Sequence, residues 1–493
     1  MLTRPASVER IDLAPGFSIA RVLTGLWQMA DQERDGRPFD PAAAAAAMRP
    51  YAGAGFTTFD MADHYGSAED VVGRYRVTAG APRVELLTKW VPSPGPITRA
   101  DVRTAVERAR ARMQSDRIDL LQFHAWSYAD PSWIDALLWL DELRQEGLIA
   151  HLGLTNTDTA HLRLAVESGL PIVSNQICYS LLDRRAAGAM STYCAAKGIG
   201  ILAFGTLAGG FLTDRWIGKP EPDWEKLETW SQMKYGRFVR AAGGWAALQQ
   251  LLRAMKLIAD KHACSVANVA CRAVLDAPAV AGVIVGARLG ERAHVDDNAR
   301  LAGLRLDAED RARLAAATSA LTPIPGDCGD EYRKPPFLTA SGDLSHHVAS
   351  FPAPYAVREA ADGTARVLSG TTWESLYGYS RAVRTGDRIL VSGTTATHRD
   401  RPMGGRDATA QAHHVIDKIE GAIRSLGGRL EDVVRTRVYV PIAGDWEAVA
   451  RAHGERFAEI QPANTLVRAE LVGSEYLVEI EAEAVVRSAI SSR

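Results

Sequence analysis

Four ionisable residues in the first quarter of the chain have complementary chemistry for reducing a carbonyl group: Asp60, Tyr65, Lys89 and His124. A hydride that reaches a carbonyl carbon leaves negative charge on oxygen, so an acid must deliver a proton there. Tyr65 is a candidate acid, and a neighbouring Lys89 would stabilise its phenolate while Asp60 holds the ammonium in place. His124 would hydrogen-bond the carbonyl oxygen. Each residue alone has an ordinary explanation, such as a helix cap, a surface charge or a core histidine.

Eight short apolar runs are spaced along the chain between Ile19 and about Ala287, with helical stretches between them. Nearly continuous apolar runs are typical of parallel strands that helices cover on both faces. Eight of them favour a closed (β/α)8 TIM barrel over an open sheet. Catalytic groups in such barrels gather where the strands end, so we expect the four residues to converge. The expected strands begin at Ile19, Phe56, Val84, Ile118, Ile149, Ile172, Gly200 and Ala281.

The composition is that of an ordinary globular protein. The 493 residues include 57 Lys plus Arg against 59 Asp plus Glu, for a formal net charge of −2. This balance argues against a nucleic-acid partner, and no apolar run is long enough to span a membrane. The amino terminus lacks the apolar stretch of a secretory signal, and five cysteines without a CxxC pair are typical of reduced thiols. We therefore expect a cytoplasmic protein.

The chain divides into three parts. Residues 1–334 form the expected barrel, and residues 335–363 break the periodicity with several prolines, which predicts a linker. Residues 364–493 show strands, a long helix, a strand, a second helix and two strands, the order of a small α+β domain. Two histidine pairs, His346-His347 and His413-His414, lack a further ligand at metal-binding spacing, so we expect no metal site.

The barrel segment resembles the aldo-keto reductase superfamily over roughly residues 10–334. The motifs FDMADHYGSAED, LLTKW, LLQFHAW, HLGLTN, SNQICYSLLDR and VIVGAR occur in the order of that family. The resemblance implies that Asp60, Tyr65, Lys89 and His124 are its catalytic tetrad. It further implies an NAD(P)H-dependent reductase of a small aldehyde or ketone.

The same resemblance implies a nicotinamide nucleotide lying across the barrel mouth. Asn156 and Gln176 match the pair that binds the carboxamide, and Phe204 matches the aromatic platform of the nicotinamide ring. Gly205-Thr206-Leu207 departs from the usual Ser-Pro-Leu of the family. A guanidinium suits a 2′-phosphate, so Arg288 favours NADP(H), with NAD(H) the alternative. The full expected cofactor set is Trp27, Thr155, Asn156, Gln176, Phe204, Gly205, Leu207, Gly209, Gly286, Arg288 and Asn298.

The carboxyl-terminal part resembles the Rid family of reactive intermediate deaminases, also called YjgF-like. The resemblance is carried by WESLYGYSRAVRTGDRILVSGT, LEDVVRTRVYV, PANTLV and LVEIEAEA. It implies a trimer, and, for deaminating members, hydrolysis of imines or enamines. Tyr379 and Glu479 match site positions, but Asn464 replaces the arginine that holds a substrate carboxylate. A ligand without a carboxylate, or a purely trimer-forming role, therefore fits as well.

Two functions follow as expectations. The first is a reductase of a small carbonyl compound, assembled as a homo-oligomer, in which the Rid-like domain supplies the carbonyl by imine hydrolysis or organises trimers. The second is a non-catalytic NADPH sensor or scaffold subunit. A long insertion after Phe211 is expected to cover the site, with aromatic residues that suit a planar ligand or pack the insertion onto the barrel: Trp216, Trp224, Trp230 and Tyr235.

Overall fold

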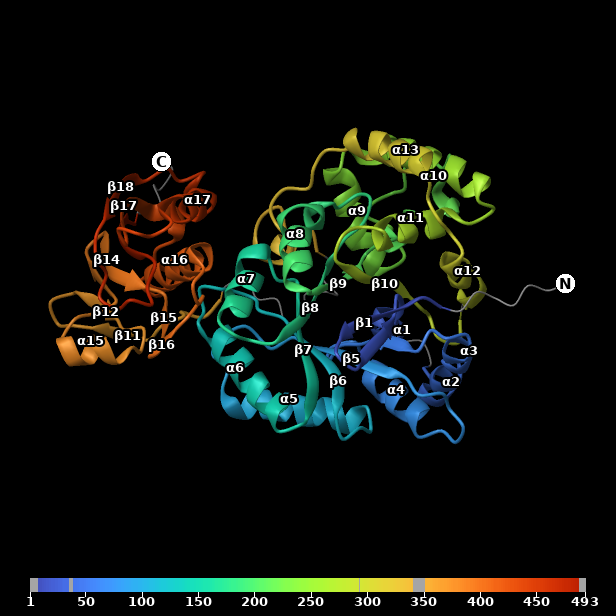
Figure 1. Cartoon of the computed structure of the whole chain (residues 1–493), viewed down its shortest axis with the longest axis horizontal. Coiled ribbons are helices and arrows are strands. Elements are labelled where there is room, and N and C mark those ends of the chain that lie inside the picture. The colour runs from blue at the N-terminus through green and yellow to red at the C-terminus, as the bar shows by residue number, and fades with distance from the viewer. Residues whose placement is uncertain (1–7, 35–38, 292, 340–350, 487–493) are drawn as a thin grey trace.

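The computed structural model describes residues 8–34, 39–291, 293–339 and 351–486. Eight parallel strands close into a barrel in the order β10-β3-β4-β5-β6-β7-β8-β9, which confirms the predicted fold (Figure 1). The strands are β3 (Val22–Gly25), β4 (Thr58–Asp60), β5 (Glu85–Trp90), β6 (Ile118–Phe123), β7 (Ile149–Thr155), β8 (Ile172–Cys178), β9 (Gly200–Phe204) and β10 (Val280–Gly286).

Helices surround this barrel and alternate with its strands along the chain. Polar N-caps begin several of them, for example Thr98 before α5 and Asp158 before α7. The helices up to β9 are α1 (Trp27–Arg34), α2 (Pro41–Ala46), α3 (Arg49–Gly53), α4 (Ala68–Arg76), α5 (Arg99–Arg112), α6 (Ser132–Gln145), α7 (Thr159–Glu167) and α8 (Ala189–Lys197). Those after β9 are α9 (Trp230–Ala241), α10 (Gly244–Lys261), α11 (Val266–Leu275), α12 (Val295–Ala299), α13 (Ala308–Ser319) and α14 (Asp330–Arg333).

The first predicted strand, beginning at Ile19, is wrong as a single element. The chain instead forms a hairpin of β1 (Arg10–Ala14) and β2 (Phe17–Ala20), and the barrel strand β3 begins at Val22. Arg21 separates the two strands because its guanidinium donates to the carbonyl oxygens of residues in and before β10. Phe17 of the hairpin packs with Leu23, Leu120 and Leu202 in one buried cluster.

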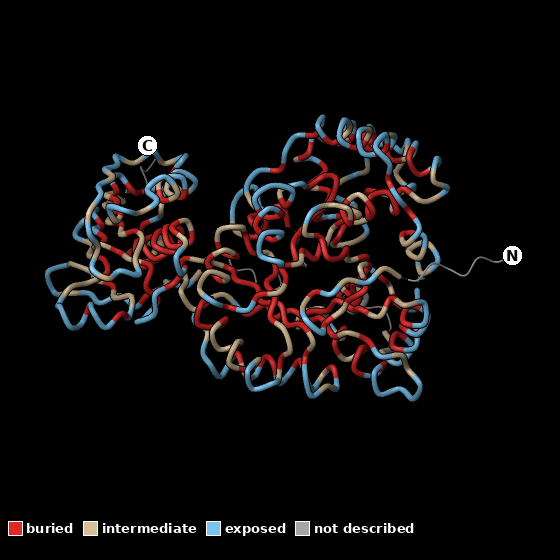
Figure 2. The backbone as a smooth tube through the Cα atoms, viewed as in Figure 1, coloured by how far each residue is buried: buried red, intermediate tan, exposed pale blue. Residues whose placement is uncertain are grey.

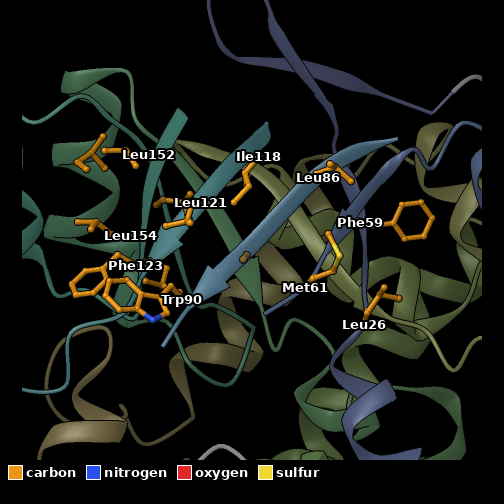
Figure 3. Close-up of a cluster of buried hydrophobic side chains, with 14 of the residues drawn as sticks. Leu26, Phe59, Met61, Leu86, Trp90, Ile118, Leu121, Phe123, Leu152 and Leu154 are labelled. Atoms are coloured by element: carbon orange, nitrogen blue, oxygen red, sulfur yellow. The ribbon is translucent and has the colours of Figure 1, made fainter. Parts of the chain in front are cut away.

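A continuous apolar layer lies between the barrel strands and the surrounding helices. Figure 3 shows side chains of neighbouring strands in it, among them Phe59 of β4, Leu86 of β5 and Leu121 of β6. All three are at most 2% exposed. The buried interior runs through the whole barrel in Figure 2, whereas exposed residues lie on its outer helices. Burial of this layer holds the strand ends, and therefore the side chains they carry, in fixed positions.

The carboxyl-terminal domain contains a seven-stranded sheet in the order β11-β12-β13-β14-β19-β17-β18. Only β17 and β18 are parallel, and α16 and α17 pack beside each other. β11 lies inside residues 335–363, the segment expected to be a linker, and pairs with β12. The elements are β11 (Val357–Glu359), β12 (Ala365–Val367), α15 (Thr372–Tyr377), β13 (Ala382–Thr385), β14 (Arg388–Thr395), β15 (Thr397–His398), β16 (Arg401–Pro402), α16 (Ala408–Ser425), β17 (Val433–Val440), α17 (Trp446–Phe457), β18 (Ala463–Arg468) and β19 (Glu479–Val485).

A buried charged cluster joins the two domains where α16 packs against α7 (Figure 1). His161 of α7 lies between two carboxylates, 2.6 Å from Asp158 and 2.8 Å from Asp417 of α16. Arg456 of α17 binds Asp417 at 2.5 Å. Burial alone would lower the pKa of His161, but the two carboxylates outweigh it and raise this pKa to about 9. The cluster therefore holds a protonated histidine at neutral pH.

Candidate functional site

A single cavity of about 760 Å³ opens at the carboxyl ends of the barrel strands. Every residue of the expected tetrad and every residue of the expected cofactor set lines it. These residues come from strands and loops spread over residues 27–298, so only barrel closure brings them together. The expected residues therefore share the wall of one cavity and are not scattered over the surface.

Asp60 and Lys89 form a buried ion pair at the ends of β4 and β5. Lys89 Nζ lies 2.8 and 2.7 Å from the two carboxylate oxygens of Asp60 and also donates to the Met61 carbonyl at 2.7 Å. The same ammonium lies 4.8 Å from the ring centroid of Tyr65. Burial lowers the pKa of Lys89 and the charge of Asp60 opposes that effect. Asp60 therefore orients Lys89, and Lys89 faces the phenol.

Tyr65 lies in the loop between β4 and α4, with its ring half-buried against the cavity wall. Its ring meets Trp27 edge-to-face at 4.9 Å and His64 at 4.9 Å. These contacts leave the ring little freedom, because edge-to-face pairs have a preferred geometry. Its position against Lys89 gives the phenol the neighbour that proton donation requires.

His124 follows β6 and is 1% exposed. Burial, and next the positive charge of Arg333, lower the pKa of His124 well below its ordinary value, so the imidazole is neutral. Its Nδ1 lies 3.5 Å from Asn156 Nδ2, while its Nε2 has no hydrogen-bond partner among the residues described. A buried ring nitrogen without a partner, in the wall of a cavity, is suited to bind a polar group of a ligand.

The expected carboxamide-binding residues lie beside this histidine. Asn156 has a left-handed backbone (φ 53°), and Arg333 donates to its carbonyl oxygen at 2.6 Å. Its Oδ1 is buried without a hydrogen-bond partner in the described part of the chain. Gln176 Nε2 donates to Asp60 at 2.6 Å and to Gln122 at 3.0 Å, and Thr155 donates to the Gln176 carbonyl. The unpaired Asn156 oxygen fits an amide of a nicotinamide ring.

Gly205 stands where the aldo-keto reductase family usually has a serine, and the structure gives a steric reason for this glycine. Gly205 has φ 71°, and a Cβ built there would lie 2.2 Å from the hydroxyl of Tyr235, which comes from α9 of the insertion. Tyr235 therefore occupies the space beside Phe204 that a side chain at position 205 would need. Any larger residue at Gly205 would displace Tyr235 or strain the backbone.

The insertion after Phe211 packs onto the barrel and also lines the cavity. Trp224 meets Phe211 and Trp245 at 5.9 and 6.0 Å, which makes it part of the packing. Trp216 and Tyr235 contact the cavity as well as the barrel, and Trp230 begins α9. The aromatic residues of the insertion therefore pack it onto the barrel, and two of them, Trp216 and Tyr235, also line the cavity.

Arg288 lines the same cavity, and its guanidinium already has polar contacts. Its guanidinium lies 3.2 Å from Gln28, 3.5 Å from Asp31 and 3.7 Å from Glu291. Asp31, which the sequence analysis did not single out, is 2% exposed. The region therefore offers both a cation for a phosphate and carboxylates that would repel one.

Lys234 and Tyr332 are among the cavity residues that were not predicted. Lys234 of α9 donates to the Tyr332 hydroxyl at 2.7 Å, and both side chains are buried. Tyr332 belongs to α14. The preceding residue of this helix, Glu331, forms an ion pair with Arg185 at 2.8 Å, and Arg185 forms a second ion pair with Asp183 at 2.7 Å. The only feature of the sequence that could have indicated this contact is the position of Lys234 among apolar residues of the insertion.

In the second domain the structure brings together only part of the expected Rid-like site. Tyr379 lies 5.6 Å from the Arg381 guanidinium, and the charge of Arg381 also acts on Glu479, whose pKa burial raises. The close approach of Glu479 requires Gly393, because a Cβ there would lie 2.0 Å from the carboxylate. Arg381 was not predicted.

Asn464 lies on the other face of the same sheet. It is in register with Thr436 and donates to its hydroxyl at 2.9 Å, beside His453 of α17. Glu479 is instead in register with Tyr439, three residues along β17. Residues three apart in a strand point to opposite faces, so within one chain Asn464 does not face Glu479.

The other expectations concern metals, thiols and membranes. All five cysteines are free thiols. His413 lies 3.1 Å from Glu455, and across residues 8–34, 39–291, 293–339 and 351–486 no group of three His, Cys, Asp or Glu side chains is arranged to hold a metal. His346-His347 lies outside the described residues. Over those same ranges, every helix is too short or too polar to cross a bilayer.

One family model matches each of the two domains. The family model described as "Aldo/keto reductase family" matches residues 21–319, and the model described as "Endoribonuclease L-PSP" matches residues 371–486. An uncharacterized protein of Streptomyces coelicolor is 38% identical over 133 residues, which are 27% of this chain and 98% of that protein.

Two named relatives share a lower identity. Flagellar radial spoke protein 5 of Chlamydomonas reinhardtii is 29% identical over 258 residues, covering 44% of this chain and 49% of that protein. Aflatoxin B1 aldehyde reductase member 2 of Rattus norvegicus is 29% identical over 223 residues, covering 43% of this chain and 57% of that protein. The chain thus spans about half the length of these two relatives.

Proposed function

This chain belongs to the aldo/keto reductase family, with a YjgF-type domain after its barrel, and on that basis we propose that it reduces an aldehyde or ketone with NAD(P)H in the cytoplasm. The observation that carries the proposal is the arrangement of Asp60, Lys89 and Tyr65, with His124 lining the same cavity. The printed name of the rat relative, an aldehyde reductase, agrees with it. Free thiols agree with a reducing compartment.

In the proposed reaction a nicotinamide, when bound, would supply the hydride that the carbonyl carbon accepts. Tyr65 gives its hydroxyl proton to the carbonyl oxygen, and water later returns a proton to the phenolate. Lys89 stabilises that phenolate, and Asp60 keeps the ammonium directed at it. His124, neutral at the pH of the cell, donates a hydrogen bond to the same oxygen and thereby orients the carbonyl. Asn156 and Gln176, which line the same cavity, would hold the carboxamide of that nicotinamide.

For the cofactor we propose NADP(H), because Arg288 lines the cavity and can bind a 2′-phosphate. We expect Arg288→Leu to lower kcat/KM for NADPH about 30-fold, a loss of about 2 kcal/mol, and that for NADH about threefold or less. Steady-state rates with both cofactors measure the ratio, and Arg305→Leu, at an exposed arginine, is the matched control.

NAD(H) is the alternative, and Asp31 favours it because a carboxylate repels a phosphate and can accept a ribose hydroxyl. A wild-type preference for NADH that Asp31→Asn reverses would establish this alternative. An unchanged cofactor ratio in Arg288→Leu would overturn the role given to Arg288.

For the second domain we propose assembly into trimers rather than imine hydrolysis. Asn464 is bound to Thr436 on the helix-covered side of the sheet, away from Glu479. The other side carries Leu390 and Val467, which are 42% and 41% exposed in the single chain. Exposed apolar side chains on a sheet face suit contact with another copy. A solution mass of three chains by light scattering supports the assembly, and a monomer at micromolar concentration contradicts it.

A non-catalytic role as a nucleotide-binding scaffold is the second candidate. The observation that favours it is the printed name of the algal relative, a flagellar radial spoke protein rather than a reductase. Turnover separates the candidates. We would mix the full-length chain with NADPH and a panel of aldehydes and ketones and follow the loss of cofactor absorbance. Substrate-dependent oxidation supports the reductase, whereas tight cofactor binding without turnover on any carbonyl supports the scaffold.

A further inference from the structure

Arg333 of α14 joins the two loops that carry His124 and Asn156. Its guanidinium donates to the carbonyl oxygen of Asn156 at 2.6 Å and to that of Ala125, the residue after His124. The proposed reaction uses the side chains of His124 and Asn156 but gives Arg333 no part. Because the guanidinium is planar and its donors have a fixed geometry, it sets the distance between the two carbonyl groups. Arg333 therefore fixes the two loops relative to each other.

The segment that carries Arg333 lies very close to Asn156. Gly329 directly precedes α14, and a Cβ at this position would lie 2.0 Å from the Asn156 carbonyl oxygen. Asn156 has a left-handed backbone (φ 53°), which is unfavourable for L residues and persists where the surrounding structure holds it. The close approach that Gly329 permits, together with the hydrogen bond from Arg333, means that α14 helps to hold Asn156 in this conformation.

Tyr128 connects Arg333 to the contact between the two domains. The centroid of its ring lies 4.5 Å from the guanidinium carbon of Arg333 and 3.4 Å from the ring centroid of His161, with the two rings 7° from parallel. His161 is in turn bound at 2.8 Å by Asp417 of α16, in the second domain. A continuous series of contacts thus runs from Asp417 to Asn156 in the wall of the cavity.

The second domain also packs directly on the loop after β6, residues 124–131. Gly421 of α16 lies so close to this loop that a Cβ there would be 2.4 Å from the Ala129 carbonyl oxygen. Arg424 of the same helix donates to Ser127 Oγ at 3.0 Å. The helix therefore holds this loop directly as well as through the stacked rings.

From these contacts we infer that Arg333 is a positioning residue of the reductase site and that docking of the second domain holds Arg333 in place. The inference rests on the proposed reductase function and concerns the geometry of its site. Without Asp417, His161 loses one of the two carboxylates that fix its ring, and the ring that stacks on it loses a fixed surface. His124 and Asn156 then lose their fixed relative position, so a carbonyl and a nicotinamide that they bind are held in poorer geometry.

Arg333→Met and Arg333→Lys in the full-length chain test the positioning role. Methionine keeps most of the apolar stem beside Tyr128 but has no donor, and lysine carries its charge at one point without the planar fork. We expect Arg333→Met to raise the Kd for NADPH about tenfold and to lower kcat at saturating NADPH about tenfold. Arg333→Lys should recover only part of either loss. Arg451→Met, at an exposed arginine of α17, is the matched control and should leave both values unchanged.

A double-mutant cycle with Asp417→Asn tests the part played by the second domain. Alone, Asp417→Asn should raise the Kd for NADPH about threefold or more, although Asp417 belongs to the second domain. Combined with Arg333→Met it should add little, because the connection to Asn156 is already broken. Hydrogen exchange should be faster in residues 124–131 and 155–158 of both single variants, while α10 keeps its protection. This last comparison separates a local loss of position from general unfolding.

The contrary results are equally defined. Unchanged Kd and kcat in a folded Arg333→Met protein would overturn the inference, as would unchanged values in Arg333→Lys if the methionine variant does not fold. Effects of Arg333→Met and Asp417→Asn that multiply in the double variant would overturn the link to the second domain. A wild-type chain that binds NADPH but reduces no aldehyde would contradict the reductase function, while the Kd and the exchange rates would still decide the role of Arg333.

Discussion

Replacing Tyr65 with Phe is expected to lower kcat by about 10³-fold, because a positioned general acid contributes about 10² to 10⁴ in rate. The substitution removes one oxygen and keeps the ring that packs on Trp27 and faces Lys89. Cofactor binding should persist, since Asn156, Gln176 and Arg288 are unchanged. Steady-state reduction of an aldehyde by NADPH measures the rate, and cofactor fluorescence measures binding.

The matched control is Tyr377→Phe, at an exposed tyrosine of α15 in the second domain. We expect this variant to reduce the aldehyde at the wild-type rate. A Tyr65→Phe protein that binds NADPH and retains more than about a tenth of the activity would contradict the role of Tyr65 as the proton donor.

Replacing Asp417 with Asn is expected to weaken the contact between the domains by about 3 to 5 kcal/mol, the usual effect of breaking a buried charge cluster. Asp417 is 2% exposed and is bound by both His161 and Arg456, so the variant leaves two buried cations beside a neutral amide. Hydrogen exchange of α7 and α16 measures the opening of this contact. Glu447→Gln removes an exposed helical ion pair with Arg451 and should change protection little.

The same cluster predicts a pH dependence with a defined sign. The pKa of His161 is raised from 6.5 to about 9, so its contribution is complete below about pH 6.5 and is lost as the pH rises through about 9. The pKa of Asp417 is lowered, since His161 and Arg456 outweigh the effect of burial, so its contribution is lost only in acid. Protection of α7 should therefore decline above neutrality, and His161→Gln should remove this decline. A flat profile in the wild type would contradict the protonated histidine.

The fold, and the position of the four expected residues in one cavity, could be predicted because each depends on a local pattern. Asp60 and Lys89 lie at the ends of apolar runs that are typical of parallel strands. Closure of the barrel then brings the ends of these strands to the same side. The first strand was wrongly predicted as one element because apolar residues, among them Ile19 and Leu23, lie on both sides of Arg21. Only the contacts of Arg21 show that β2 ends before it and β3 begins after it.

Contacts between distant segments could not be read from the sequence. Lys234 and Tyr332 are 98 residues apart, and His161 and Asp417 are 256 apart, so no periodicity links either pair. The orientation of Asn464 was hidden for another reason: β18 is exposed along nearly its whole length, so alternation does not reveal which side faces the helices. Arg381 likewise has no signal beyond its position directly before β13.

The central claim is that this chain transfers a hydride from a nicotinamide to a carbonyl carbon. We would incubate the full-length protein with benzaldehyde and NADPH that carries deuterium at both C4 positions, and analyse the product by mass spectrometry and NMR. The account predicts benzyl alcohol with one deuterium on the former carbonyl carbon and one oxidised cofactor for each alcohol formed. Alcohol without deuterium, or cofactor oxidation without alcohol, would contradict it.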